Sequence, residues 1–95
     1  MPRPRKPRRL QFQPNVYYYK PVGVPMRELE EVSLLPDELE ALKLHDVDGL
    51  NHIESAQRMG VSQPTFGRIL DSVYKKIANA VINGKAIRIE KIFGN

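Results

Sequence analysis

Residues 53–70, IESAQRMGVSQPTFGRIL, constrain the fold of this chain more than any other stretch. Ala56 is small enough to let two helices cross closely. Gly60 follows four residues later, where a turn needs a positive φ that glycine adopts without steric cost. Ser62 is a favoured N-cap for a second helix, and Phe66 returns to the core at helical spacing. This spacing predicts a helix-turn-helix.

The first turns of the second helix remain exposed in this pattern, and in a helix-turn-helix that end enters the major groove of DNA. The Arg68 guanidinium can bond to guanine O6 and N7, and the Gln63 amide to adenine N6 and N7. The alternatives are a surface ion pair of Arg68 with Asp71 and a plain surface role for Gln63. Gly67 weakens a helix by about 1 kcal/mol relative to Ala, which close approach of DNA or of the first helix would offset. The base-reading candidates are Gln63, Pro64, Thr65, Gly67 and Arg68.

Charge is divided unevenly along the 95 residues, whose net charge is +4. Residues 1–26 carry six basic and no acidic side chains, residues 27–54 two basic and nine acidic ones, and residues 55–95 seven basic and two acidic ones. The positive charge therefore lies in the N-terminal arm and around the helix-turn-helix, as expected of a protein with one face on phosphate. An arm that binds nothing is the alternative. The phosphate-contact candidates are Arg3, Arg5, Lys6, Arg8, Arg9, Arg58, Ser62, Lys75 and Lys76.

The chain is expected to form a flexible basic arm over residues 1–9 and a single domain over residues 10–95. The prolines of MPRPRKPRR deny the arm a helix. Alternating apolar and charged residues predict a strand over residues 85–92, which pairs with residues 10–13 of the same chain or of a second one. Helices are predicted over residues 27–32, 36–47, 52–59 and 63–82.

Apolar spacing also predicts which helix faces are buried. In the helix that begins at Pro36, these positions are Leu39, Leu42 and Val47. Ser55 stands where helix-turn-helix motifs usually have an aliphatic residue, so its hydroxyl needs a partner, for which a backbone carbonyl one turn earlier is suitable. In the last helix the predicted buried stripe comprises Phe66, Ile69, Leu70, Val73, Ile77, Ala80 and Val81.

Three other groups of side chains have a structural and a functional interpretation. His45 and His52 are the only histidines, and surface or capping roles are preferred over a metal site. The tyrosines at residues 17–19 either pack on the domain or stack on the bases of a single strand. The acidic stretch at residues 28–40 is either a solvated helix face or a surface for a basic partner.

Several classes of protein are disfavoured. The chain has no cysteine, which rules out disulfides and thiolate metal sites and fits the cytoplasm. No apolar run approaches the roughly 20 residues of a membrane span, and the N-terminus lacks the apolar segment of a signal peptide. There is no nucleophile–base pair, no phosphate-binding glycine loop and no metal-ligand spacing. We therefore expect a cytoplasmic protein that is not an enzyme, does not bind membranes and holds no cofactor or metal.

Residues 35–80 resemble region 4 of bacterial sigma factors, through the pattern LP…E…L…L…GL…A..MGVS…T…R.L. Over nearly its full length the chain is identified as a member of the domain-of-unknown-function 134 family, small prokaryotic proteins predicted to bind DNA. The segments that carry this resemblance are PRKPRRL, YYYKPVGVP, RELEEV, DELEAL, RMGVSQPTFGRIL and NGKAIRIE. The resemblance implies a mainly α fold, a sigma-region-4-like helix-turn-helix bundle with short terminal strands at about residues 10–13 and 85–92.

Two departures from these families limit what carries over. Some members have cysteines near the N-terminal basic segment, and this chain has none, so no metal site is transferred. The positions that read bases in sigma factors correspond here to Gln63, Pro64, Gly67 and Arg68. Only Gln63 and Arg68 have long polar side chains, which argues against promoter recognition of the sigma type.

The leading hypothesis is a transcriptional regulator that binds double-stranded DNA sequence-specifically and reads the major groove with the helix at residues 63–82. A homodimer is expected, because one recognition helix reads few base pairs. The second hypothesis is a protein-interaction module that contacts RNA polymerase or another regulator through its acidic first half. The third is an RNA-binding protein that uses the arm and the tyrosines.

Overall fold

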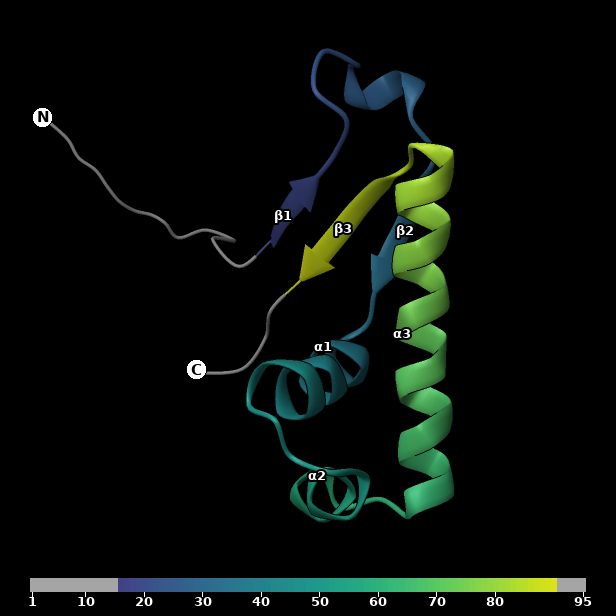
Figure 1. Cartoon of the computed structure of the whole chain (residues 1–95). Coiled ribbons are helices and arrows are strands. Elements are labelled where there is room, and N and C mark those ends of the chain that lie inside the picture. Colours follow the sequence, from purple (N-terminus) through teal and green to yellow (C-terminus); the bar gives the residue numbers. More distant parts are fainter. Residues whose placement is uncertain (1–15, 91–95) are drawn as a thin grey trace, which may run out of the picture.

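The long helix α3 (Gln63–Asn83) is the support on which the rest of the chain packs (Figure 1). The computed structural model describes residues 16–90, so the arm at residues 1–9 and the predicted strand at residues 10–13 lie outside the described residues. A three-stranded sheet lies beside the C-terminal half of α3, and two short helices lie beside its N-terminal half. The other elements are β1 (Val16–Tyr19), the 3-10 turn η1 (Met26–Glu28), β2 (Glu31–Leu34), α1 (Pro36–Leu42), the π-helical turn η2 (Lys43–Val47), α2 (His52–Met59) and β3 (Ala86–Glu90).

The last strand, β3, is the centre of the sheet. The strand order is β1-β3-β2, and β3 runs antiparallel to β1 and parallel to β2. Ile89 lies opposite Tyr17 on one side and opposite Leu34 on the other. The predicted C-terminal strand is thus confirmed. The partner expected for it, at residues 10–13, is wrong for Ala86–Glu90, because β1 and β2 of the same chain occupy both sides of this strand.

The helix predicted over residues 27–32 is wrong. Only Met26–Glu28 forms a single 3-10 turn, closed by a 2.9 Å hydrogen bond from the Glu28 amide to the Pro25 carbonyl. The chain then becomes extended at Leu29 and continues as β2. The reason is tertiary: Val32 and Leu34 face the core when β2 pairs with β3, so the long-range pairing overrides the local helical preference.

The helix predicted to begin at Pro36 is present, but its end differs from the expectation. After α1 the chain forms the π-helical turn η2, in which the Asp48 amide donates to the Lys43 carbonyl at 2.8 Å. Val47, predicted to be buried, is 75% exposed. A π turn has more residues per turn than an α-helix, so Val47 is displaced from the face that buries Leu44.

The two helices predicted over residues 52–59 and 63–82 are present as α2 and α3, with a glycine turn between them. Asn51 caps α2 by accepting the Glu54 amide at 2.8 Å, and the Glu54 carboxylate accepts the Asn51 amide in return. Gly60 follows α2 with a φ of +71°, the left-handed conformation in which glycine avoids a steric cost. Ser62 then caps α3 through the Thr65 amide, and Gly84 ends α3.

The core is centred on the inner face of α3. Phe66, Leu70 and Val73 are buried there, against Ala41 of α1, Ala56 of α2 and two residues of the sheet. Val81, predicted to belong to the same stripe, is 69% exposed. At this level α3 extends past α1 and α2 and contacts the sheet through the side that carries Ala80. Within residues 16–90, no helix is both long enough and apolar enough to cross a membrane.

Ser55 places an unpaired hydroxyl group in the core. Its side chain is fully buried, and its hydroxyl oxygen has no hydrogen-bond partner among the described residues. The expected bond to a carbonyl one turn earlier is therefore absent. The Asn51 carbonyl, which stands at that position, instead accepts the Ser55 amide at 2.9 Å as in any helix. An unpaired buried hydroxyl costs about 1–3 kcal/mol.

Candidate nucleic-acid interface

The start of α3 lies at the end of the molecule opposite the sheet, next to α2 (Figure 1). Gln63, Pro64 and Arg68 are exposed there, as predicted. Thr65 and Gly67 are half-buried, because they lie on the flanks of the helix, closer to the core face that Phe66 occupies. These three exposed side chains are therefore accessible to a partner.

Gly67 has open space around it. A Cβ atom built on this residue would meet no atom within 4 Å, the backbone of its own helix aside. Close approach of the first helix, one of the two reasons considered for a glycine here, is therefore wrong. Close approach of an outside molecule stays a prediction.

Arg68 is held by the cap of its own helix. Its Nη2 donates to Thr65 Oγ1 at 3.3 Å, and Thr65 Oγ1 also accepts the Ser62 hydroxyl at 3.0 Å. The Thr65 amide closes the cap by donating to Ser62 Oγ at 3.2 Å. The three side chains are thus linked in one chain of hydrogen bonds on the outside of the helix.

Asp71 forms no ion pair with Arg68 among the described residues, although it stands one turn further along α3 and the sequence offered it as the alternative partner. The Asp71 carboxylate instead pairs with Lys75 Nζ at 3.3 Å, and both side chains are largely exposed. Such surface pairs contribute about 0–1 kcal/mol, and the three donors of an ammonium allow Lys75 to keep its contact with Asp71 while it binds another acceptor. Lys75 is therefore still accessible to a phosphate.

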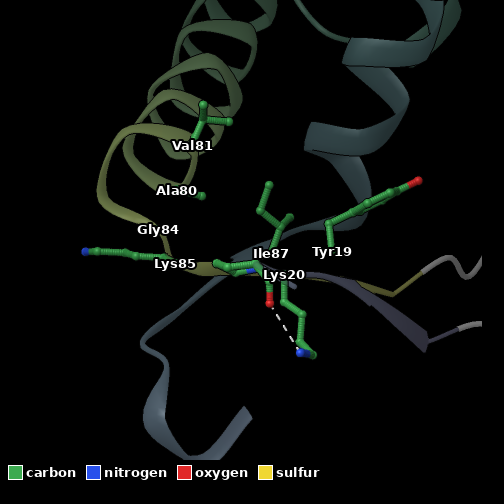
Figure 2. A pocket seen from close by; sticks show the side chains of 8 residues that line it. Tyr19, Lys20, Ala80, Val81, Gly84, Lys85 and Ile87 are labelled. Atoms are coloured by element: carbon green, nitrogen blue, oxygen red, sulfur yellow. Dashed lines mark hydrogen bonds between the residues drawn. The ribbon is translucent and has the colours of Figure 1, made fainter. Parts of the chain in front are cut away.

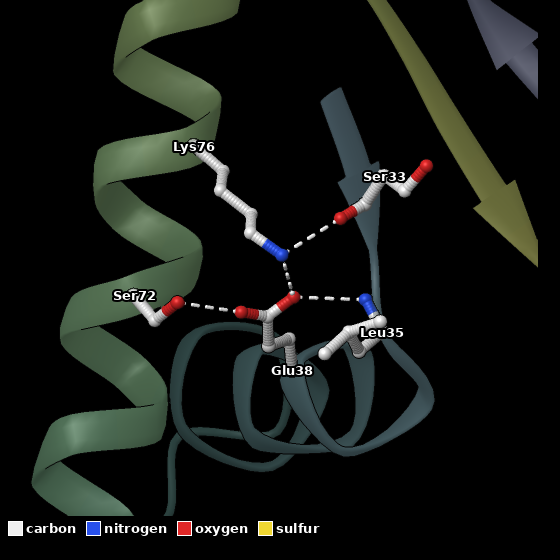
Figure 3. A network of polar contacts seen from close by, with 5 residues as sticks. All are labelled: Ser33, Leu35, Glu38, Ser72 and Lys76. Carbon is white, nitrogen blue, oxygen red and sulfur yellow. Dashed lines mark hydrogen bonds and ion pairs between the residues drawn. The ribbon is translucent and has the colours of Figure 1, made fainter. Parts of the chain in front are cut away.

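Lys76 is committed to the interior and is a poor phosphate contact. Its Nζ lies 2.8 Å from Glu38 Oε1 and donates to the Ser33 carbonyl at 2.8 Å (Figure 3). Glu38 Oε1 also accepts the Leu35 amide at 2.8 Å, and Glu38 Oε2 accepts the Ser72 hydroxyl at 2.6 Å. Lys76 therefore does not belong to the candidate interface, because binding a phosphate would break its ion pair with the buried Glu38, which joins α1 to α3, and its hydrogen bond to β2.

Glu38 stays ionised in this network. Burial alone would raise the pKa of its carboxyl group, but the hydrogen bonds from the Leu35 amide, Lys76 and Ser72, with the charge of Lys76, outweigh burial. The net result is a pKa below the ordinary value for a glutamate. Glu38 therefore remains a fixed negative charge that fixes α1 on the flank of α3.

The remaining phosphate candidates divide between the described and the undescribed parts of the chain. Arg58 is exposed on α2, beside a hollow lined by Leu50, Glu54 and Gln57. Ser62 is exposed as the cap of α3. The arm residues Arg3, Arg5, Lys6, Arg8 and Arg9 lie outside the described residues.

The comparisons with known proteins decide the family. The model of the family described as "Protein of unknown function DUF134" matches residues 1–92. The chain belongs to the DUF134 family. A UPF0251 protein of Moorella thermoacetica is 58% identical over 90 residues, which cover 95% of this chain and 60% of that protein. A UPF0251 protein of Caldanaerobacter subterraneus subsp. tengcongensis is 53% identical over 98 residues, which cover 99% of this chain and 83% of that protein.

This DUF134 chain spans only part of its relatives. A third relative, a UPF0251 protein of Desulforudis audaxviator, is 50% identical over 90 residues, which cover 95% of this chain and 59% of that protein. No solved structure matches. The family assignment thus rests on sequence similarity, and the fold described above is that of the shared segment.

Sequence reasoning missed a ring cluster beneath the start of α3 in this DUF134 chain. The rings of His45 and His52 lie 4.8 Å apart, and both pack edge-to-face against Phe66 at 6.3 and 5.3 Å between centroids. His45 Nδ1 is also 2.8 Å from the Leu50 carbonyl. No group of three or more possible metal ligands occurs within residues 16–90. The histidines therefore help to hold the start of α3 in place, a role that their spacing in the sequence does not indicate.

The tyrosines of β1 pack less tightly than expected. Tyr17 and Tyr19 contact each other edge-to-face at 5.8 Å, yet Tyr19 is 61% exposed. Tyr19 borders an open hollow of about 210 Å³ with Val81 and Ile87 (Figure 2). This hollow lies at the sheet end of α3, far from Arg68 along the helix. It is therefore not part of the candidate interface at the helix start.

The acidic first half offers less free surface than the sequence implied. Glu38 is buried and paired, and Glu30 lies 3.1 Å from Lys85. Glu28, Glu31, Asp37 and Glu40 remain exposed, and the side chain of Glu30 is 79% exposed beside Lys85. A basic partner would therefore meet fewer carboxylates than the acidic stretch at residues 28–40 contains.

Proposed function

We propose that this protein binds double-stranded DNA sequence-specifically, reads the major groove with the start of α3, and acts as a transcriptional regulator. The observation that carries the proposal is the turn between α2 and α3, in which Gly60 has a φ of +71° and Ser62 caps the second helix. A helix pair with this turn presents the N-terminal end of its second helix to a DNA groove. That end here carries Gln63 and Arg68, both exposed.

The chemistry of these two side chains supports base reading. A guanidinium bonds bidentately to guanine, and a primary amide to adenine, each for about 1–3 kcal/mol of discrimination. Arg58 on α2 and Lys75 on α3 supply positive charge beside them, and the arm adds five basic residues at positions 3, 5, 6, 8 and 9. Phosphate contacts of this kind fix the register of a protein on the duplex.

The scaffold proposed here is the sigma-region-4 type of helix-turn-helix, used by a regulator and not by a sigma factor. Gln63 and Arg68 are the only long polar side chains among its four base-facing positions. We further propose a homodimer on a two-fold symmetric site, since a single recognition helix reads few base pairs. β3 is fully paired within its own chain, so the dimer does not require an exchanged strand.

The test is a selection of duplexes from a random pool, followed by fluorescence anisotropy of the enriched site over a series of salt concentrations. Arg68→Ala should relax one base position by about 1–3 kcal/mol. Arg27→Ala is the matched control, because it removes the same charge from an exposed site on η1 at the sheet end of the molecule (Figure 1). It should leave the motif unchanged.

Two results would contradict the proposal. One is a selection that enriches no motif, and the other is an Arg68→Ala variant that discriminates as the wild type does. Either result would make the helix-turn-helix a scaffold, and a protein partner such as RNA polymerase would become the leading candidate. An asymmetric motif would contradict the two-fold homodimer alone.

A further inference from the structure

We infer that Thr65 is a positioning residue that orients the Arg68 guanidinium for base reading without neutralising its charge. This inference rests on the proposed function. It assigns Thr65 a different role from the one its place on the recognition helix suggests, which is to touch a base itself.

The first support is the hydrogen-bond geometry. Thr65 Oγ1 lies 3.3 Å from Arg68 Nη2 and 3.0 Å from Ser62 Oγ. Because Ser62 is itself fixed by the Thr65 amide at 3.2 Å, the hydroxyl that receives Arg68 is part of the helix cap. The side chain of Arg68 is thereby bound to a hydroxyl that is itself linked to the helix cap.

The second support is that the acceptor is neutral. A carboxylate partner would offset the positive charge of Arg68, and that ion pair would have to break before the guanidinium met a guanine or a phosphate. Asp71 stands one turn away on α3, and Lys75 occupies it at 3.3 Å. Asp37 and Glu38 line the same hollow as Thr65 and Arg68, but Glu38 is bound to Lys76, and no ion pair joins Arg68 to a carboxylate within residues 16–90. The hydroxyl of Thr65 therefore orients Arg68, while the Asp71–Lys75 pair keeps a competing acceptor occupied.

The third support is the number of donors. A guanidinium has five N–H donors in a fixed fork, and the bond to Thr65 uses one donor on Nη2. Two parallel donors suffice for guanine O6 and N7. The orienting bond and the base contact can therefore coexist. An arginine held in this way loses less rotamer freedom on binding than an unrestrained one.

The experiment compares base discrimination, position by position, for wild type, Arg68→Ala, Thr65→Val and Thr65→Ser on the duplex enriched by selection. Valine has the shape of threonine without the hydroxyl and keeps the amide that donates to Ser62, whereas serine keeps the hydroxyl. Arg68→Ala should relax one position by roughly 5- to 150-fold. Thr65→Val should relax the same position by about two- to fivefold, and Thr65→Ser should restore it. The thermal midpoint of each variant is measured alongside.

The outcomes separate this inference from the proposed function. If Arg68→Ala relaxes a position and Thr65→Val does not, the positioning role is overturned and the proposed function stands. If Thr65→Val relaxes a different position from Arg68→Ala, Thr65 reads its own base and the inference is again wrong. Equal weakening at all positions with a lowered thermal midpoint would reduce Thr65 to a structural residue. If Arg68→Ala itself has no effect, the proposed function fails.

Discussion

The two ends of α3 are held by different kinds of contact. At its start, the caps and the Arg68 bond join residues three positions apart, as in Ser62–Thr65 and Thr65–Arg68. Along its middle and at the sheet, the contacts join distant parts of the chain: Glu38 reaches Lys76, 38 positions away. The comparison shows that contacts between neighbours in the sequence fix the start of α3, the proposed DNA-reading end. Contacts between distant residues, such as Glu38 and Lys76, attach α3 to the rest of the molecule.

The largest expected effect on stability comes from breaking the contact between Glu38 of α1 and Lys76 of α3. Glu38→Ala should destabilise the fold by about 3 kcal/mol, because it leaves Lys76 and the Leu35 amide without the carboxylate they share. The urea midpoint measures the effect. Glu40→Ala, an exposed glutamate on the same helix, is the control and should stay within about 0.5 kcal/mol of wild type. Equal effects of the two variants would show that the network does not stabilise the fold.

Low pH should weaken the contact between Glu38 and Lys76 in the wild-type protein, and so lower its stability. The pKa of Glu38 is lowered in the folded state, so its contribution to stability is fully present above the unfolded pKa of about 4.3. That contribution is lost as the pH falls from there through the folded pKa. Glu38→Gln should remove this part of the pH dependence in denaturation curves recorded at successive pH values. A wild-type profile with the same slope as the variant would be inconsistent with a lowered pKa.

Replacing two glycines near the start of α3, Gly60 and Gly67, by alanine should change the stability of the fold in opposite directions. Gly60→Ala should destabilise the fold by about 1–2 kcal/mol, because residue 60 has a φ of +71°. Gly67→Ala should stabilise it by about 1 kcal/mol, because a Cβ at Gly67 meets no atom within 4 Å beyond its own helix. Thermal unfolding of both variants measures this. If Gly67→Ala also weakens DNA binding, close approach of the DNA is supported, and unchanged binding removes that reason for a glycine.

Removing the unpaired hydroxyl of Ser55, a buried residue of α2, should stabilise the fold. Ser55→Ala should stabilise the fold by about 1 kcal/mol, since it deletes a fully buried hydroxyl that has no partner among the described residues. Urea denaturation is again the measurement, with Ser72→Ala as the control. Ser72 donates to Glu38, so its replacement should destabilise the fold. A destabilised Ser55→Ala variant would mean that the hydroxyl is satisfied in solution, for example by a bound water.

The smallest effect concerns binding alone. Lys75→Met frees Asp71 to compete for Arg68, so discrimination at the base read by Arg68 should fall about two- to fivefold. The ratio of affinities for two duplexes cancels the uniform loss of a phosphate contact. Adding Asp71→Asn should restore the ratio, and a double variant that stays impaired would exclude the competition.

The local end was predictable from the sequence because each of its signals acts over a few residues. Asn51, Gly60 and Ser62 fixed the bounds of α2 and the start of α3 correctly. The bond between Thr65 and Arg68 also joins helix neighbours, and the i,i+3 spacing was available as a signal. The spacing alone did not identify Thr65 as the partner of Arg68, because Asp71 lies equally far from Arg68 on the other side and competes as a partner.

The distant contacts could not be predicted, since nothing near Glu38 or β2 indicates their partners. Residues 27–32 have no local preference strong enough to prevent a helical assignment, and only pairing with β3 makes Glu31–Leu34 a strand. Val47 was misassigned because an α-helical period was assumed across the π-helical turn η2. Val81 was misassigned because its exposure depends on where the neighbouring helices end. For β2 and Val81 the decisive atoms lie far away in the chain, whereas for Val47 the cause is the local turn η2.

The position of β3 between β1 and β2 has a consequence for how the chain assembles during synthesis. Both outer strands precede α3, and the strand that pairs with both of them is made after it. Until β3 leaves the ribosome, β1 and β2 lack their partner and the apolar residues of β2 have no sheet to join. The helix-turn-helix, whose contacts are nearer in the chain, can form earlier. The sheet therefore completes the domain as a closing step, and a chain truncated before residue 86 should contain the helices without the sheet.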